Sequence, residues 1–179
     1  MPPVDTSVRG AALRIAAEEG PLEITYESVQ AYHGHGALAM LALVFQGLRG
    51  ALPLLEENGQ PVPRTALAVT SGHPGPGVRD AIEFVTRAVT RGCYTVDTSL
   101  PEARYSANRD KSYSFRLRRD AWEARAVLRD GVLPPEFFAL LGAPGAQARQ
   151  AHAALRRRIA GEVLLRPPQE LFLFSTLRG

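Results

Sequence analysis

The sequence predicts an α+β fold, in which a mixed or antiparallel sheet packs against one long apolar helix. Residues 37–55 are apolar on almost every side, which is typical of a helix surrounded by other elements. Residues 93–97 and 112–128 alternate apolar and polar side chains, which is typical of half-buried antiparallel strands. Because helices are interleaved with strands and hairpins along the chain, α+β is the class that we expect.

Residues 1–20 are expected to be a peripheral segment, and residues 21–179 to form one α+β domain. Val8–Glu19 is a short amphipathic stretch, so it predicts a peripheral helix or a frayed arm. Thr25 is a residue type that often caps helices, and we expect it to begin a helix over Tyr26–Tyr32.

A strand, a glycine-rich loop and a helix follow one another in the middle of the chain. Thr65–Thr70 predicts a buried strand, and the loop Ser71–Gly77 leads from it into a helix expected over 78–90. The hairpin within 112–128 is expected to turn near Arg119 and Asp120. The other predicted elements are helices over 135–141 and 144–164 and a last strand over 170–175.

Composition excludes several classes of protein. An apolar fraction of 45% is ordinary for a globular protein, and a net charge of +3 with only short arginine runs argues against a nucleic-acid partner. The single cysteine, Cys93, excludes an intrachain disulfide framework, and we expect a buried, inert thiol there. With no signal-like start and no uninterrupted apolar run of membrane-spanning length, we expect a cytoplasmic protein without a membrane association.

Two histidines stand at the start of the long apolar helix, in Tyr32–Gly36 (YHGHG). Residues two apart on a helix point to nearly opposite sides, so His33 and His35 can share a task only if the backbone is not helical there. Glycines at 34 and 36 permit such a backbone. The histidines are therefore either metal ligands or an acid/base pair, or they form ordinary hydrogen bonds at a helix start or lie exposed.

His73 lies in the glycine-rich loop before the second helix (GHPGPG). Backbone N–H groups and the helix dipole favour anions at such a helix start. His73 is either part of a functional site with the other two histidines or a cap of its own helix. The fourth histidine, His152, falls in a polar helix over 147–158 and is expected to be solvated.

Three segments resemble the FmdE family, whose members are related to one of the subunits of formylmethanofuran dehydrogenase. Ala31–His35 (AYHGH) is similar to the opening motif of that family, and Val78–Thr86 (VRDAIEFVT) to its DAIQ-type helix. Lys111–Phe115 (KSYSF) resembles its lysine-then-strand segment. The resemblance covers roughly Ile24–Arg118 and implies an α+β core, a homodimer and a metal site near His33 and His35.

The chain departs from the family at its cysteines. Ala37, Gly77 and Ala88 stand where family members commonly carry cysteine, and no C-terminal zinc finger is present. A metal would therefore rest on imidazole and oxygen ligands, and three imidazoles with an open position suit zinc. We expect a divalent metal, zinc above others, to be bound by residues His33, His35 and His73. The glycines expected to form the binding site for the metal or ligand are Gly34, Gly36, Gly72 and Gly75.

Lys111 and Tyr113 are the candidate catalytic residues. Lys111 is the only lysine in a chain that otherwise uses arginine, which indicates either a need for an amine that can lose its proton or a chance survivor on a loop. The sequence thus predicts an FmdE-like protein that binds a metal and acts on or senses a small polar molecule. The alternatives are a binding protein for an anion or another small ligand, and an accessory subunit of an oxidoreductase.

Overall fold

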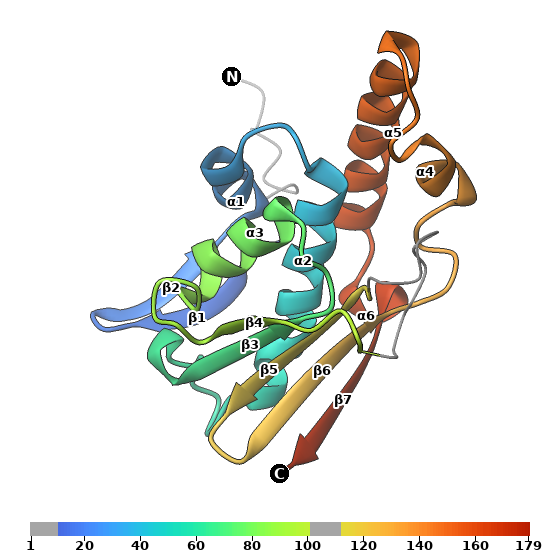
Figure 1. The fold of residues 1–179 in the computed structure, drawn as a ribbon. Helices are drawn as coiled ribbons and strands as arrows, with labels where there is room; N and C mark the ends of the chain where they lie inside the picture. Colours follow the sequence, from blue (N-terminus) through green and yellow to red (C-terminus); the bar gives the residue numbers. More distant parts are fainter. Residues whose placement is uncertain (1–10, 101–111) are drawn as a thin grey trace, which may run out of the picture.

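The computed structural model describes residues 11–100 and 112–179 and confirms the predicted α+β architecture. One sheet has the strand order β4-β3-β5-β6-β7, and the helices gather on one of its faces (Figure 1). Its strands are β3 (Leu67–Ser71), β4 (Tyr94–Val96), β5 (Ser114–Arg119), β6 (Trp122–Leu128) and β7 (Phe172–Arg178). The helices are α1 (Tyr26–His33), α2 (Leu38–Ala51), α3 (Pro76–Thr86), α4 (Pro135–Leu140), α5 (Ala146–Leu165) and α6 (Pro168–Leu171).

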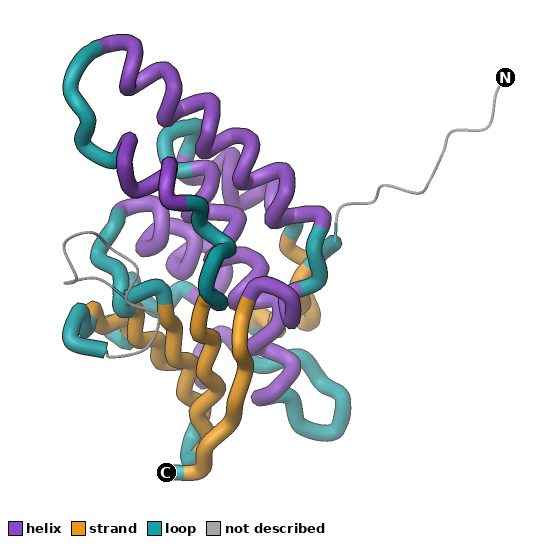
Figure 2. The backbone as a smooth tube through the Cα atoms, turned by 90° about the vertical axis from the view of Figure 1, so that its right-hand side faces the viewer, coloured by secondary structure: helices purple, strands orange, loops and turns teal. Residues whose placement is uncertain are grey.

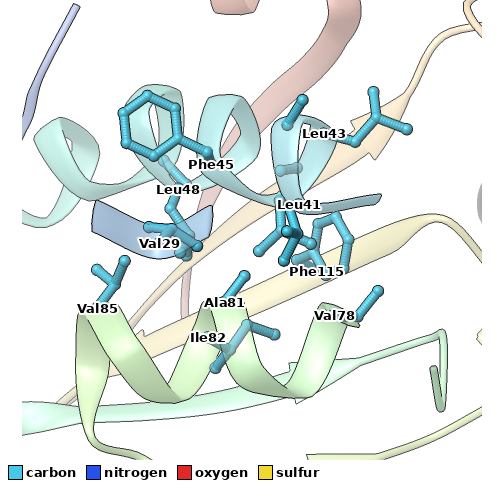
Figure 3. Packing of buried hydrophobic residues seen from close by; sticks show 14 of the residues in the cluster. Val29, Leu41, Leu43, Phe45, Leu48, Val78, Ala81, Ile82, Val85 and Phe115 are labelled. Atoms are coloured by element: carbon cyan, nitrogen blue, oxygen red, sulfur yellow. The ribbon is translucent and has the colours of Figure 1, made fainter. Parts of the chain in front are cut away.

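The long apolar helix is the centre of the fold, as predicted. Helix α2 is buried along almost its whole length, and Leu52–Leu55 continues it as a 3-10 turn. Leu41 and Leu48 lie among apolar side chains of α1, α3 and the sheet (Figure 3). The stretch Leu38–Leu55 is long and apolar enough to cross a membrane, but 78% of it is buried inside this fold. Packing within the domain therefore accounts for its apolar composition.

One polar residue of α2 is also fully buried. Gln46 has no exposed surface, and its side-chain amide donates to the carbonyl oxygens of Val163 and Arg166 at 2.9 and 2.6 Å. The last carbonyls of a helix have no partner within the helix, so Gln46 satisfies the end of α5 from the side. These contacts fix α5 against α2.

The sheet confirms the predicted hairpin and corrects one strand. Strands β5 and β6 pair antiparallel around a turn at Asp120, whose φ of 52° is the left-handed conformation that tight hairpin turns use. The residues of 93–97 were expected in an antiparallel strand, but β4 pairs parallel with β3. Because α3 and the turn after it carry the chain back across the sheet, β4 enters beside β3 in the same direction.

The predicted peripheral helix over Val8–Glu19 is wrong. The described part of that stretch holds β1 (Leu13–Ala17) and the turn at Glu18 and Glu19. After the turn, β2 (Gly20–Ile24) pairs antiparallel with β1, and its first residue, Gly20, has a φ of 136°. Leu13 and Ile15 are buried in the core. Alternate residues of β1 therefore pack against the domain, a period of two that an amphipathic helix would not give.

The last third of the chain adds a helical pair beside the core. Helix α5 is the longest in the structure and packs along α2, while α4 folds back against α5. In Figure 1 these two helices rise away from the sheet beside the first turn of α2, and Figure 2 shows the helical layer above the strands. This arrangement brings the C-terminal third of the chain next to the starts of α2 and α3.

Candidate functional site

A pocket of about 390 Å³ lies where the starts of α2 and α3 meet the α4–α5 pair. Most of its wall is apolar, and three of the four histidines of the chain lie on it. Pockets with apolar walls and a few convergent polar groups are the usual form of small-molecule sites. The lining residues are His33, Gly36, Ala37, Met40, His73, Gly75, Pro76, Gly77, Val78, Tyr113, Phe137, Leu141, His152 and Arg156.

His33 is the last residue of α1 and is oriented by a carboxylate. Its Nδ1 lies 2.8 Å from Oδ2 of Asp80, and the ring is only 13% exposed. An ionised carboxylate only accepts hydrogen bonds, so Nδ1 is the donor and Nε2 of the neutral ring keeps its lone pair. A Cβ added to Gly77 would lie 3.6 Å from that Nε2, so this atom faces the first turn of α3.

His35 lies outside the pocket. Its ring is exposed and its Nδ1 pairs with the side-chain amide of Gln30 at 3.1 Å. Between the two histidines, Gly34 ends α1 with a φ of 92° and donates its N–H to the carbonyl of Gln30. Gly34 therefore sends His33 and His35 in different directions, and of the two glycines here only Gly36 lines the pocket.

His73 lines the pocket and is held by the backbone around it. The N–H of Gly75 donates to Nδ1 of His73 at 2.9 Å, and the ring lies 5.1 Å from that of Tyr113. Ser71 binds both the N–H and the carbonyl of His73 through its hydroxyl. The ring thus binds the N–H of Gly75, the residue before α3, and no described side chain caps the helix itself, so the capping role considered for His73 is not what the structure has. Because Nδ1 accepts, the neutral ring carries its proton on Nε2.

His152 was expected to be solvated, and this prediction is wrong. Its side chain is 8% exposed and packs edge-on against Phe137 at 5.2 Å. Burial, with a smaller contribution from Arg156, lowers the pKa of His152, so the imidazole is neutral near pH 7. Among the described residues its buried Nε2 has no hydrogen-bond partner. Sequence reasoning missed it because the polar composition of this helix does not show that α4 folds back over the His152 side.

Tyr113 is buried, lines the pocket and contacts His73 and Phe138. Burial raises the pKa of its phenol to about 12, so Tyr113 can donate a hydrogen bond near neutral pH but is no base. Lys111, the other predicted catalytic residue, lies outside the described residues.

The two glycines predicted in the second loop have different positions. Gly75 lines the pocket, directly before α3. Gly72 does not, because its N–H and carbonyl extend the pairing of β3 with β5 through Ser114 and Ser112. A Cβ on Gly72 would lie 2.5 Å from Cβ of Ser112, so this glycine serves close strand packing.

The positions at which the FmdE family commonly has cysteine, Ala37 and Gly77, adjoin each other beside His33. A Cβ on Gly77 would lie only 2.5 Å from Cβ of Ala37, so the two helix starts touch where a side chain at 77 would stand. Among the described residues, no group of three or more His, Cys, Asp or Glu side chains could hold a metal ion. The structure thus leaves His35 apart from His33 and His73, and metal binding stays a prediction.

The polar groups of the pocket suit an anion. The first N–H groups of an α-helix have no partner within it, and here they belong to Gly77 and Val78 at the pocket wall. Arg156 also lines the pocket, and its guanidinium donates to the carbonyl of Gly36 at 2.7 Å. No acidic side chain is among the described lining residues.

A scan of protein-family models finds no match to this chain, and a search of curated proteins finds none either. The resemblance to the FmdE family thus stays a prediction from the motifs themselves.

Proposed function

We propose that the protein binds a small organic anion in this pocket, a molecule with an apolar body and one carboxylate or phosphate group. The apolar body would contact Met40, Val78 and Phe137, and the charged group would lie toward the start of α3 and Arg156. Charge-assisted hydrogen bonds from a guanidinium and from helix N–H groups are the common means of holding such groups.

The observation that carries this proposal is the Nε2 atom of His152. His152 lines the pocket, and its Nε2 is buried and lacks a partner among the described residues. A buried polar group without a hydrogen bond costs about 1–3 kcal/mol. A ligand group that hydrogen-bonds to Nε2 would remove that cost. The pocket should therefore bind a ligand with a polar group more tightly than a purely apolar one.

Binding is tested by calorimetry and thermal stabilisation with benzoate, small aliphatic carboxylates and phosphate esters, all in the presence of a chelator. We expect stabilisation by at least one of these anions, lost in His152→Phe and weakened in Arg156→Gln. His35→Gln and Arg157→Gln change the same residue types outside the pocket lining and serve as matched controls. Failure of every anion to stabilise the protein, or equal losses in the controls, would contradict the proposal.

The zinc-binding, homodimeric form of the prediction has its own tests. Metal analysis of protein purified without an affinity tag should find near-stoichiometric zinc, lost in His33→Gln, if the FmdE-like site forms. Metal-free protein that still binds anions would refute the zinc site and support the anion proposal. The predicted homodimer is tested by measuring the mass of the protein in solution, and a monomer would remove the dimer prediction.

A further inference from the structure

Two histidines of the pocket hold their ring protons on opposite nitrogens. Asp80 accepts from Nδ1 of His33, which leaves a lone pair on Nε2, whereas Nδ1 of His73 accepts from Gly75. Both rings lie against the start of α3: a Cβ on Gly75 would lie 2.7 Å from Cε1 of His73, and one on Gly77 would lie 3.6 Å from Nε2 of His33. His33 is thus a proton acceptor that faces the proposed anion site.

We infer that the pocket is a catalytic site in which Nε2 of His33 is the general base and Asp80 is the residue that positions it. The inference rests on the proposed anion-binding function and adds a reaction to it. A carboxylate on Nδ1 fixes the ring orientation and the tautomer that leaves Nε2 free to take a proton, as in other histidine bases. The anion would bring its acidic proton to this atom.

The chemistry of the lining indicates the class of substrate. Among the described lining residues there is no serine, threonine, cysteine or lysine, so a covalent intermediate on such a nucleophile has no support there. Nε2 of His33 lies beside Gly77, where an added Cβ would be 3.6 Å away, and the N–H groups of Gly77 and Val78 at this helix start suit an oxygen that gains negative charge. A base beside an oxyanion site fits proton abstraction next to a carbonyl group.

The substrate class is therefore a small carboxylate or phosphate ester with a C–H bond next to a carbonyl group. In the step, the proton moves from carbon to Nε2 of His33, and the C–H electron pair becomes a carbon–carbon double bond. The carbonyl π pair moves to oxygen, where the first N–H groups of α3 stabilise it while Arg156 holds the carboxylate or phosphate group. Return of the proton to the same or a neighbouring carbon gives exchange or isomerisation, so no oxidant or reductant takes part.

The base is tested with 5-nitrobenzisoxazole, a flat apolar probe. When a base takes the proton from its C3, that C–H electron pair completes a nitrile and the N–O bond breaks, leaving a coloured phenolate whose charge develops on oxygen. We expect turnover above that of free imidazole at the same concentration, falling by about 100-fold in His33→Gln. The control His35→Gln should keep the wild-type rate. No turnover, or an unchanged rate in His33→Gln, overturns the inference.

The positioning role of Asp80 is tested by a measurement that loss of packing alone would not change, namely which ring nitrogen of His33 carries the proton. In ¹⁵N NMR of histidine-labelled protein, the neutral His33 ring should carry its proton on Nδ1. Asp80→Asn offers an amide N–H to that nitrogen, so the proton should move to Nε2 and turnover should fall with it. A tautomer that stays on Nδ1 while turnover falls, or a His33 proton on Nε2 in the wild type, contradicts the role of Asp80.

Benzoate separates this inference from the proposed function. In one outcome, benzoate stabilises the protein through His152 and Arg156 while His33→Gln turns the probe over as fast as wild type. That result would support the anion site and refute His33 as the base. If turnover depends on His33 but none of the anions tested, benzoate included, binds or inhibits, His33 is the base and the anion proposal is wrong. Zinc bound at His33 would overturn the base, because a coordinated Nε2 has no lone pair to take a proton.

Discussion

The starts of α2 and α3 have similar composition, with histidines among closely spaced glycines, but they differ in what holds the rings. Before α2, His33 is held by the carboxylate of Asp80, which is far away in the sequence, on α3. The exposed His35 pairs with the side-chain amide of Gln30. Before α3, Nδ1 of His73 accepts from the N–H of Gly75 in its own loop, and the ring lies against that of Tyr113. Nδ1 of His33 thus binds a residue far along the chain, whereas Nδ1 of His73 binds a residue of its own loop.

This difference explains why the two segments contribute different chemistry to one pocket. A local backbone donor makes Nδ1 of His73 an acceptor, whereas a carboxylate makes Nδ1 of His33 a donor. The glycines differ in the same way, because Gly77 allows the two helix starts to touch and Gly34 ends a helix. Similar residue types therefore do not imply a shared ligand set.

The largest effect is expected where the two helix starts touch. In Gly77→Ala the new Cβ would lie 2.5 Å from Cβ of Ala37, and neither backbone-fixed atom can move alone. We expect a loss of about 1–3 kcal/mol in the free energy of unfolding, measured by urea denaturation. Gly36→Ala, which has nothing within 4 Å of its Cβ, is the control. Adding Ala37→Gly to the Gly77→Ala chain should restore stability, and failure to do so would refute the close contact.

A smaller effect separates the fixed ring from the exposed one. Asp80→Ala removes the partner of the largely buried His33 ring, and we expect a loss of about 1 kcal/mol in the free energy of unfolding. Gln30→Ala removes the partner of the exposed His35 and should cost within about 0.5 kcal/mol. Equal losses in the two variants would mean that the two histidines are held alike.

The smallest effect concerns His152 and pH. Its pKa in the folded protein is lowered, so as the pH falls the unfolded chain takes up a proton before the folded protein does. Stability should therefore fall as the pH drops through about 6.5, the ordinary value for histidine, and level off below the folded pKa. His152→Phe should lose this part of the dependence in urea denaturation series from about pH 8 to 5, whereas His35→Gln should keep it. Identical pH profiles for His152→Phe and wild type would contradict the burial of a neutral ring.

Local patterns predicted most of the secondary structure. Thr25 caps α1 through its side chain, as its residue type indicates, and the turn at Asp120 falls where the alternation of residues 112–128 changes. The N-terminal hairpin was missed because a stretch of ten or so residues fits both an amphipathic helix and a short strand with a turn. Burial of Leu13 and Ile15 against the rest of the domain decides between them.

The site was predicted in part, and the division has a physical reason. The sequence by itself determined the apolar helix α2, the glycine-rich starts of α2 and α3, and the presence of His33 and His73 beside them, because these depend on residues near in the chain. Only the tertiary structure decided that Asp80 orients His33, that His35 turns away, and that α4 and α5 bring His152 and Arg156 to the pocket. Those outcomes depend on how helices far apart in the chain pack, since burial and partner distance, not residue type, determine what an imidazole can do.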